Sequence, residues 1–368
     1  MSSEVCVVGG GVIGLAVAAA LRDKGVEVTC LEHGAPGGGQ SAGRTRQFRH
    51  LHRNPALIEL AARARTGWLN WQERFDRTLL GSEGALRAGA ERFELDALRT
   101  AGVPAVELDE QGAAEHFPIA RLSQREGMII WDPLAGAIRA AETISVLTEH
   151  LGESLQRAEV HSIAIEPSGE SVTLQTSTGV HHSARCVICA GAGTDRLVRT
   201  VGLPVHQDRQ AHLRLSFHAK VMPAPALPCF SDRSSDAGEI VYGLSDLGDR
   251  YAVGLAAVTT YPAVEDLALD VPHGVDHSAQ CRRIVEYTKR VLPGLDPGPV
   301  DQVVRLTTTL PNHPEDGFDF YRAGPVLAIA GPNLFKFAPV IGEQMAEEAT
   351  RDDASERPMI RATETGEG

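Results

Sequence analysis

Three glycines and one acid near the start of the chain have the types and spacing needed to hold a dinucleotide. Gly9, Gly11 and Gly14 form a Gly-x-Gly-x-x-Gly turn after an apolar run, and Glu32 follows Gly14 by eighteen residues. In such a unit the first glycine permits a tight turn and the second lets the backbone approach a pyrophosphate. The third lets a helix pack closely on a strand, and the acid accepts a hydrogen bond from a ribose hydroxyl. This segment predicts binding of FAD or NAD.

The turn works only if regular elements flank it. Residues 5–8 are predicted to be a strand, residues from about Val12 to Leu21 a helix that Gly25 ends, and residues 26–31 a second strand. The helix start offers free N–H groups and a positive dipole end to phosphates. The charge of Glu32 disfavours a 2′-phosphate on the ribose. Together these elements form one βαβ unit.

Length and charge narrow the class of protein. A chain of 368 residues suggests two domains, or one domain with a large insertion. The net charge of −13 argues against nucleic acid or an anionic membrane as a partner. No apolar run reaches the ~18 residues of a membrane span, and the chain enters its first strand without room for a signal peptide. We therefore expect a cytoplasmic enzyme, a monomer or a small homo-oligomer.

Cysteine and histidine patterns suggest neither redox nor metal chemistry. The six cysteines fit buried thiols better than a disulfide framework. Cys186 and Cys189 could form a redox pair, but residues three apart on a strand face opposite sides. His50 and His52 have no acidic or Cys partner nearby in the sequence, so no metal site is expected.

Hydrophobic periodicity predicts an α/β fold made of two interleaved domains. Helices are expected at 54–79, 135–156, 277–292 and 340–348, a hairpin at 159–180, and strands at 184–190, 213–217, 239–244, 251–257, 303–309 and 325–330. A discontinuous Rossmann-type domain (1–80, 140–205 and 322–350) is interrupted by a mostly antiparallel β-sheet substrate domain with helices (81–139 and 206–321). The charged segment 351–368 is expected to be a flexible tail.

Four segments carry a family resemblance. They are the N-terminal βαβ unit, residues 41–50 (SAGRTRQFRH), residues 187–194 (VICAGAGT) and residues 335–342 (FKFAPVIG). Their motifs, order and separation resemble the D-amino-acid-oxidase superfamily of FAD enzymes, especially its branch of monomeric sarcosine oxidase and N-methyl-amino-acid oxidases. The resemblance spans nearly the whole chain apart from the tail, and it implies that the cofactor is FAD.

The C-terminal segment independently favours FAD over NAD. Lys336 precedes a predicted helix, whose start could stabilise the negative charge of a reduced flavin. NAD needs no such C-terminal return to its binding domain. The glycine turn and the resemblance together assign these residues to the cofactor: Gly9, Gly11, Val12, Ile13, Gly14, Glu32, His33, Ser41, Arg44, Thr45, Arg46, Ala190, Gly191, Gly193, Arg305, Gly331, Asn333, Leu334, Phe335 and Lys336.

The resemblance also implies three catalytic residues. Arg49 and Lys336 match the pair that clasps the carboxylate of an amino-acid substrate, for which an arginine fork and a lysine point charge are suited. Tyr242 matches an active-site tyrosine, although a packing role is equally compatible. Arg46 fits a structural role, holding neighbouring backbone near the flavin.

Several positions depart from the family pattern. Arg305 stands where sarcosine oxidases carry the cysteine that bonds to FAD, so noncovalent FAD is expected. Ala252 stands at the oxygen-activating lysine, Ala256 at an active-site histidine, and residues 331–334 form a shorter, less glycine-rich loop. These changes leave the substrate and the electron acceptor open.

The predicted reaction is oxidation of a C–N bond in a secondary or cyclic amine or amino acid. A hydride would pass to flavin N5, with O₂ as the acceptor. Two alternatives remain: an FAD-dependent amine or amino-acid dehydrogenase that uses another acceptor, and a flavin-binding subunit of a larger complex. A closed pocket lined by Arg49, Tyr242 and Lys336 would favour a self-sufficient enzyme, whereas an exposed apolar patch on the second domain would favour the partner-dependent alternatives.

Overall fold

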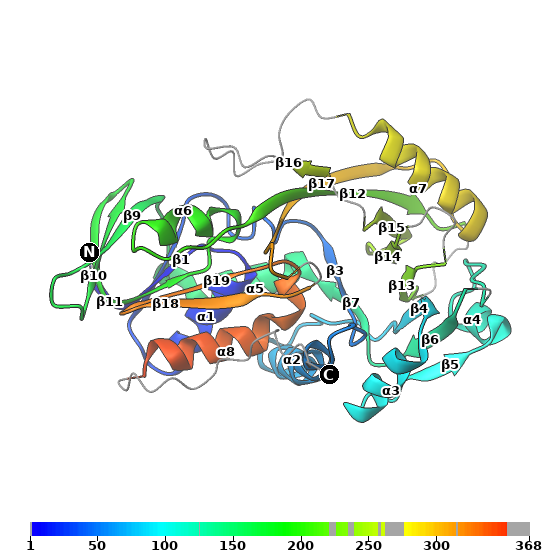
Figure 1. Ribbon diagram of the computed structural model, residues 1–368, viewed down its shortest axis with the longest axis horizontal. Helices are drawn as coiled ribbons and strands as arrows, with labels where there is room; N and C mark the ends of the chain where they lie inside the picture. Colours follow the sequence, from blue (N-terminus) through cyan, green and yellow to red (C-terminus); the bar gives the residue numbers. More distant parts are fainter. Residues whose placement is uncertain are drawn as a thin grey trace.

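A computed structural model describes residues 2–124, 126–220, 226–234, 239–256, 259–261, 276–313 and 316–351. Two large sheets lie in separate lobes, and the long strands β12 (Asp208–His218) and β17 (Asp301–Thr309) extend from one lobe toward the other (Figure 1). The predicted tail, from residue 352, and position 257 of a predicted strand lie outside the described residues.

The first sheet contains the glycine turn. Its order is β18-β19-β11-β1-β2-β8, with β10 paired to β11 and β9 to β10, and its central strands run parallel. The strands are β1 (Ser2–Val8), β2 (Val28–Glu32), β8 (Leu155–Arg157), β9 (Val160–Ile165), β10 (Val172–Thr176), β11 (Gly179–Ile188), β18 (Asp319–Ala323) and β19 (Val326–Ala330).

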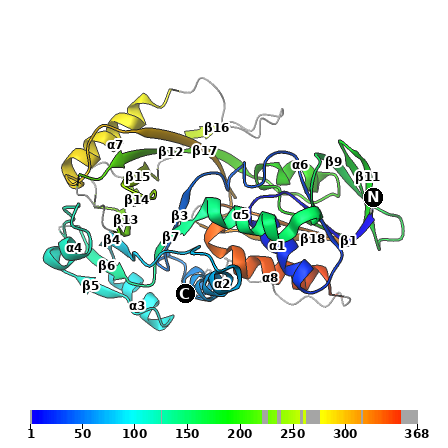
Figure 2. The ribbon, with the colours of Figure 1, turned by 180° about the vertical axis from the view of Figure 1, so that it is seen from behind.

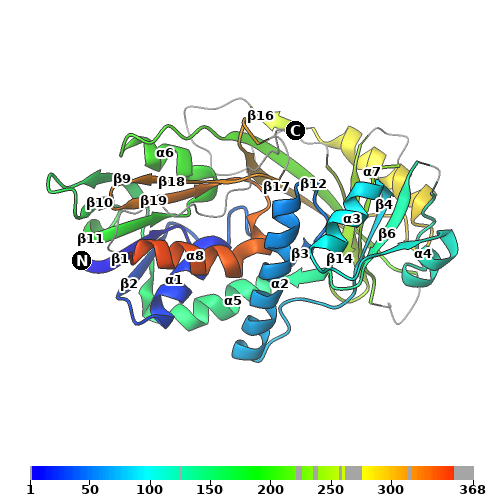
Figure 3. The ribbon, with the colours of Figure 1, turned by 60° about the horizontal axis from the view of Figure 1, so that its bottom comes forward.

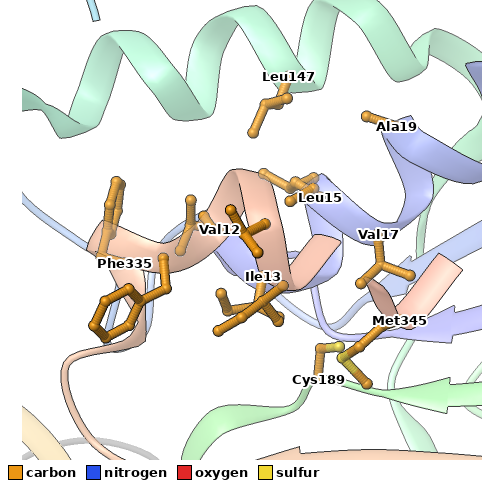
Figure 4. Packing of buried hydrophobic residues seen from close by; sticks show 14 of the residues in the cluster. Val12, Ile13, Leu15, Val17, Ala19, Leu147, Cys189, Phe335 and Met345 are labelled. Atoms are coloured by element: carbon orange, nitrogen blue, oxygen red, sulfur yellow. The ribbon is translucent and has the colours of Figure 1, made fainter. Parts of the chain in front are cut away.

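Helix α1 (Val12–Asp23) is the centre of the packing on this sheet. It contacts both α5 (Ala140–Leu151) and α8 (Ala338–Ala349), and Figure 4 shows its apolar side chains between them. The helices α1 and α8 approach closely because Gly342 has no side chain: a Cβ there would lie 2.7 Å from that of Ala16. Viewed from below, α2 (Pro55–Phe75) crosses the N-terminal end of α8 (Figure 3). This packing holds the first turns of α8 beside α1.

The second sheet is mostly antiparallel; among its described strands, only β4 and β13 pair in parallel. Its strands are β4 (Ala85–Ala90), β5 (Val106–Leu108), β6 (Met128–Asp132), β12, β13 (Cys229–Asp232), β14 (Val241–Ser245), β15 (Arg250–Leu255), β16 (Thr259–Tyr261) and β17. Helix α7 (Ser278–Val291) packs on β12 and β15, while α3 (Arg92–Thr100) and α4 (Glu110–His116) lie at the opposite edge, as the view from behind shows (Figure 2).

Short elements connect the two lobes. Strand β3 (Thr45–Phe48) pairs with β7 (Gly136–Arg139), and α6 (Thr194–Arg199) follows β11. Three 3₁₀ turns complete the chain order: η1 (Gly152–Ser154), η2 (Gly191–Gly193) and η3 (Leu334–Phe337). Within the part of the chain that the structure describes, no helix is both long and apolar enough to cross a bilayer.

The predicted fold class, a Rossmann-type domain with a mostly antiparallel second domain, is confirmed. The expected helix at 135–156 is too long, because its first residues pair with β3 as β7 and its last residues pair with β2 as β8. The domain division itself stays a prediction; β18 begins at Asp319, before the boundary placed at 322. The helix predicted at 340–348 begins earlier, at Ala338.

Candidate active site

The glycine turn has the close contacts that its sequence predicted. Gly9 has a φ of +109°, and a Cβ there would lie 2.5 Å from the carbonyl oxygen of Cys189. A Cβ on Gly14 would lie 1.8 Å from the carbonyl oxygen of Gly9, so no side chain fits at either position. Gly11 instead faces open space, with Ser41 Oγ the nearest atom at 3.4 Å from a built Cβ. The turn is therefore bare backbone on its exposed side.

Polar groups beside the turn suit a dinucleotide. Ser41 Oγ accepts the N–H of Val12 at 3.0 Å at the start of α1. The Glu32 carboxylate ends β2 and accepts the N–H groups of Gly10 at 2.6 Å and Gly34 at 2.8 Å. These bonds hold the carboxylate in the position from which it can still accept a ribose hydroxyl. The bare turn, the helix start and the placed acid together fit the adenosine and pyrophosphate of FAD.

A cavity of about 950 Å³ runs from this turn to the second sheet. Nearly all the residues that the sequence assigned to cofactor or substrate line it. Three do not: Gly14 packs inside the turn, Arg44 lines a second cavity of about 290 Å³, and Thr45 is buried with its hydroxyl 3.4 Å from Asp246 Oδ1. The structure thus brings one continuous set of predicted residues together.

Lys336 lies in η3 at the start of α8. Its carbonyl oxygen accepts the indole N–H of Trp68 at 2.8 Å, which ties η3 to α2. The side chain is only 7% exposed, and its ammonium lies 5.2 Å from the ring centre of Phe337. Packing therefore determines where this charge lies.

Arg49 and Lys336 meet on one carboxylate oxygen. Oδ2 of Asp316 lies 3.0 Å from Arg49 Nη2 and 3.4 Å from Lys336 Nζ. Nδ1 of His52 lies 3.0 Å from the same oxygen, and Asn333 donates to Oδ1 at 2.6 Å. Arg49 and Lys336 can thus bind one carboxylate together, and in this structure that carboxylate is the side chain of Asp316. We call Arg49, Lys336, His52 and Asp316 the carboxylate clasp.

Burial and neighbouring charges shift the pKa values of Lys336, His52 and Asp316. Burial lowers the pKa of Lys336 to about 8, although Asp316 opposes the shift. Burial, followed by Lys336 and Arg49, lowers the pKa of His52 well below its ordinary value. Burial alone would raise the pKa of Asp316, but Lys336, His52 and Arg49 hold it well below its usual range. At neutral pH the clasp holds a carboxylate, two cations and a neutral imidazole.

Tyr242 lies beside two arginines, Arg214 and Arg305, that line the same cavity. The Arg214 guanidinium stacks on the Tyr242 ring at 5.2 Å, and its Nε donates to the phenol oxygen at 3.1 Å. Burial and then Arg214 lower the pKa of Arg305 to about 10. A Cβ on Gly43 would lie 1.8 Å from Arg305 Nη2, so Arg305 presses against the backbone of the segment that includes Arg46.

Arg46 contacts the backbone of its own loop, and its predicted structural role stays a prediction. Its guanidinium donates to the carbonyl oxygens of Thr45 and Gln40, both at 2.9 Å, and lies over the ring of Phe335. Two alanines stand at positions that depart from the family pattern. Ala256 lines the main cavity, and Ala252 lines the smaller cavity beside Arg305.

Sequence reasoning missed several residues of the site. Asp316 and His52 complete the clasp, and Arg214 contacts Tyr242, yet none belongs to a recognisable motif. His52 and His50 each have an acidic partner, Asp316 and Asp132, that lies far away in the sequence. Within the described ranges, no group of three potential metal ligands occurs. Of these residues, Arg214 alone has a sequence signal for a role in the site, because it places a charge in the apolar pattern of the strand predicted at 213–217.

The cysteines lie as the strand argument predicted. Cys186 packs in the apolar cluster on one face of the first sheet, and Cys189 packs in the cluster on the other face. Burial raises the pKa of both thiols. The two therefore share no surface for a redox reaction.

The fold and the site together define a flavin-dependent oxidoreductase. The family model described as FAD dependent oxidoreductase (DAO) matches residues 4–348. The chain belongs to this family, and its cofactor is FAD.

Similar proteins extend over almost the whole chain. Monomeric sarcosine oxidase of Streptomyces avermitilis is 26% identical over 374 residues, which cover 94% of this chain and 92% of that protein. The structure of a Tyr258Phe mutant of NikD, described as an unusual amino acid oxidase essential for nikkomycin biosynthesis, has a TM-score of 0.83 at 20% identity, covering 97% of this chain and 95% of that one. L-proline dehydrogenase from P. horikoshii has a TM-score of 0.80 at 18% identity, covering 95% and 93%.

Proposed function

We propose that this enzyme oxidises the C–N bond of a secondary or cyclic amino acid whose carboxylate binds Arg49 and Lys336. One observation carries the proposal: both cations converge on a single carboxylate oxygen in the cavity that begins at the glycine turn. The carboxylate of Asp316 stands in for that of the substrate. Sarcosine and proline, named for two of the similar proteins, are secondary amines with a carboxylate, which supports the same substrate class.

The residues of the chain bind and orient the substrate. The planar Arg49 fork can hold both carboxylate oxygens, while Lys336 adds a point charge that its pKa of about 8 keeps positive at neutral pH. Tyr242 lines the cavity beside the stacked Arg214, and its phenol could hydrogen-bond the amine end of the substrate. His52 is neutral at neutral pH, so Arg49 and Lys336 supply the positive charge of the clasp.

FAD supplies the redox chemistry when bound: it takes a hydride at N5 from the carbon beside nitrogen, and O₂ is the proposed final acceptor. No side-chain base is required to remove a proton if the amine binds neutral. The clasp would set the position of the substrate in the cavity. A dehydrogenase with a different acceptor is the second candidate, favoured by Ala252, which has no charge to assist O₂.

The test is reduction of the bound flavin without oxygen. Arg49→Lys keeps the charge but loses the fork, and it should weaken binding of an amino-acid substrate by about 1.5–3 kcal/mol, the range for a hydrogen bond to a charged group. Lys336→Met should also slow reduction, with the FAD spectrum nearly unchanged. Lys24→Met, an exposed lysine paired with Glu347, is the control and should have no effect. If both site variants reduce as wild type does with every active substrate, the substrate has no carboxylate in the clasp.

A further inference from the structure

Two further cations, Arg87 and Arg233, line the cavity without belonging to the clasp. Arg87, in the middle of β4, is 6% exposed, and its Nη2 lies 3.4 Å from Oε1 of Glu94, which is fully buried. Arg233 Nη1 lies 3.7 Å from the same oxygen. Glu94 uses its other oxygen to accept the N–H of Glu91 at the start of α3. One carboxylate therefore serves two guanidinium groups, which we call the arginine pair.

Arg87 is left with unused donors. Among the described residues, neither its Nε nor its Nη2 makes a hydrogen bond, although both atoms are buried. A buried charge without hydrogen bonds is costly, and a ligand that supplies acceptors relieves the cost. Burial, then the nearby Arg49, lowers the pKa of Arg87 to about 9, which agrees with a charge that lacks compensation.

The arginine pair and the clasp line the same cavity. The clasp holds Arg49 and Lys336 against one Asp316, and the arginine pair holds two guanidinium groups against one Glu94, so each carries one excess positive charge. The whole chain, by contrast, has a net charge of −13. A pyrophosphate held at the glycine turn would not balance the arginine pair, because β4 lies in the lobe opposite that turn (Figure 1).

We propose that the arginine pair binds a second acidic group of the substrate, so that the preferred substrate is a secondary amino acid with two anionic groups. This inference rests on the proposed function, in which the first carboxylate occupies the clasp. Carboxylate and phosphonate oxygens both match the donors of Arg87, and Ser231 lies in the same wall as a further polar contact. Oxidation of the C–N bond is unchanged; the second group sets only which amine is held for it.

The experiment compares substrates with one and two acidic groups on the FAD-loaded enzyme. Anaerobic flavin reduction is followed with N-methylglycine, N-methyl-L-aspartate and N-(phosphonomethyl)glycine, and binding of the unreactive acetate and succinate is followed through the flavin absorbance. We expect wild type to favour the diacids, and Arg87→Gln to weaken them by about 10- to 100-fold while leaving the monoacids within about twofold. The carboxylate and phosphonate probes separate the two chemistries.

Two further variants keep the result interpretable. Arg233→Gln changes the less buried partner, so it should lower the same diacid preference even if Arg87→Gln loses its fold. Arg92→Gln, an exposed arginine on α3 paired with Glu107, is the matched control. A diacid preference that survives in Arg233→Gln and in folded Arg87→Gln overturns the inference, and so does a wild type without such a preference. In either case, flavin reduction by monoacids would still uphold the proposed function. A wild type that no amino acid reduces would instead overturn the proposed function.

Discussion

Replacing Asp316 by asparagine should strengthen the binding of carboxylates. In the structure Asp316 Oδ2 lies 3.0 Å from Arg49 and 3.4 Å from Lys336, the two groups that we propose bind the substrate carboxylate. A bound carboxylate must therefore displace an internal competitor. The asparagine side chain would keep the size of the aspartate while removing its charge, so it would compete only as a neutral acceptor.

The size of the effect follows from the contacts that change. A hydrogen bond to a charged group is worth about 1.5–3 kcal/mol, and the Asp316 side chain is only 17% exposed, so solvent screens it weakly. Losing the competitor should improve the affinity for acetate by about 10- to 150-fold, since 1.4 kcal/mol is about tenfold. The assay is a titration of the oxidised flavin absorbance with acetate under anaerobic conditions.

The pH dependence checks the same reasoning. Lys336 must be charged to hold a carboxylate, and its pKa is about 8, so acetate affinity of wild type should fall as the pH rises through about 8. Asp316 raises the pKa of Lys336, so in Asp316→Asn the fall should begin at a lower pH. Asp319→Asn, whose carboxylate contacts His313 at 2.9 Å instead of the clasp, is the control. Unchanged or weaker acetate binding in Asp316→Asn would refute the competition and make Asp316 a support for Arg49 and Lys336.

Three further outcomes follow from the structure. Acid precipitation should release all the colour into the supernatant as FAD, because Arg305 cannot form the thioether of a cysteine; colour kept in the pellet would contradict this. Gly14→Ala should abolish FAD retention and lower the melting temperature, because a Cβ there would lie 1.8 Å from Gly9 O, whereas Gly298→Ala, with no atom closer than 3.5 Å, should be neutral in thermal unfolding and FAD fluorescence. Photoreduced wild type should reoxidise slowly in stopped flow, and Ala252→Lys should speed it by placing an ammonium beside Arg305 in the smaller cavity. A fast wild type that the lysine does not improve would show that the Arg214 and Arg305 charges already suffice.

The sequence alone determined the dinucleotide unit and the fold class. Gly14 is required by its contact with the carbonyl oxygen of Gly9 inside one short βαβ segment, and Gly9 by its own positive φ in the turn. Apolar periodicity decides which segments become strands or helices. Such features depend on backbone sterics over a few residues, so the residue types reveal them directly. The resemblance of the four segments then pointed to Arg49 and Lys336 as a pair.

Only the tertiary structure decided what these residues contact. Asp316 is 267 residues from Arg49 in the sequence, and sheet and helix packing brings its carboxylate between Arg49 and Lys336. The predicted helix at 135–156 lost its ends to strand pairing with β3 and β2, because a distant partner satisfies the backbone there. No sequence pattern marked Arg87, and it becomes a buried charge only when β4 pairs with β13 and β6. Long-range packing sets charge compensation, which no local pattern of residue types contains.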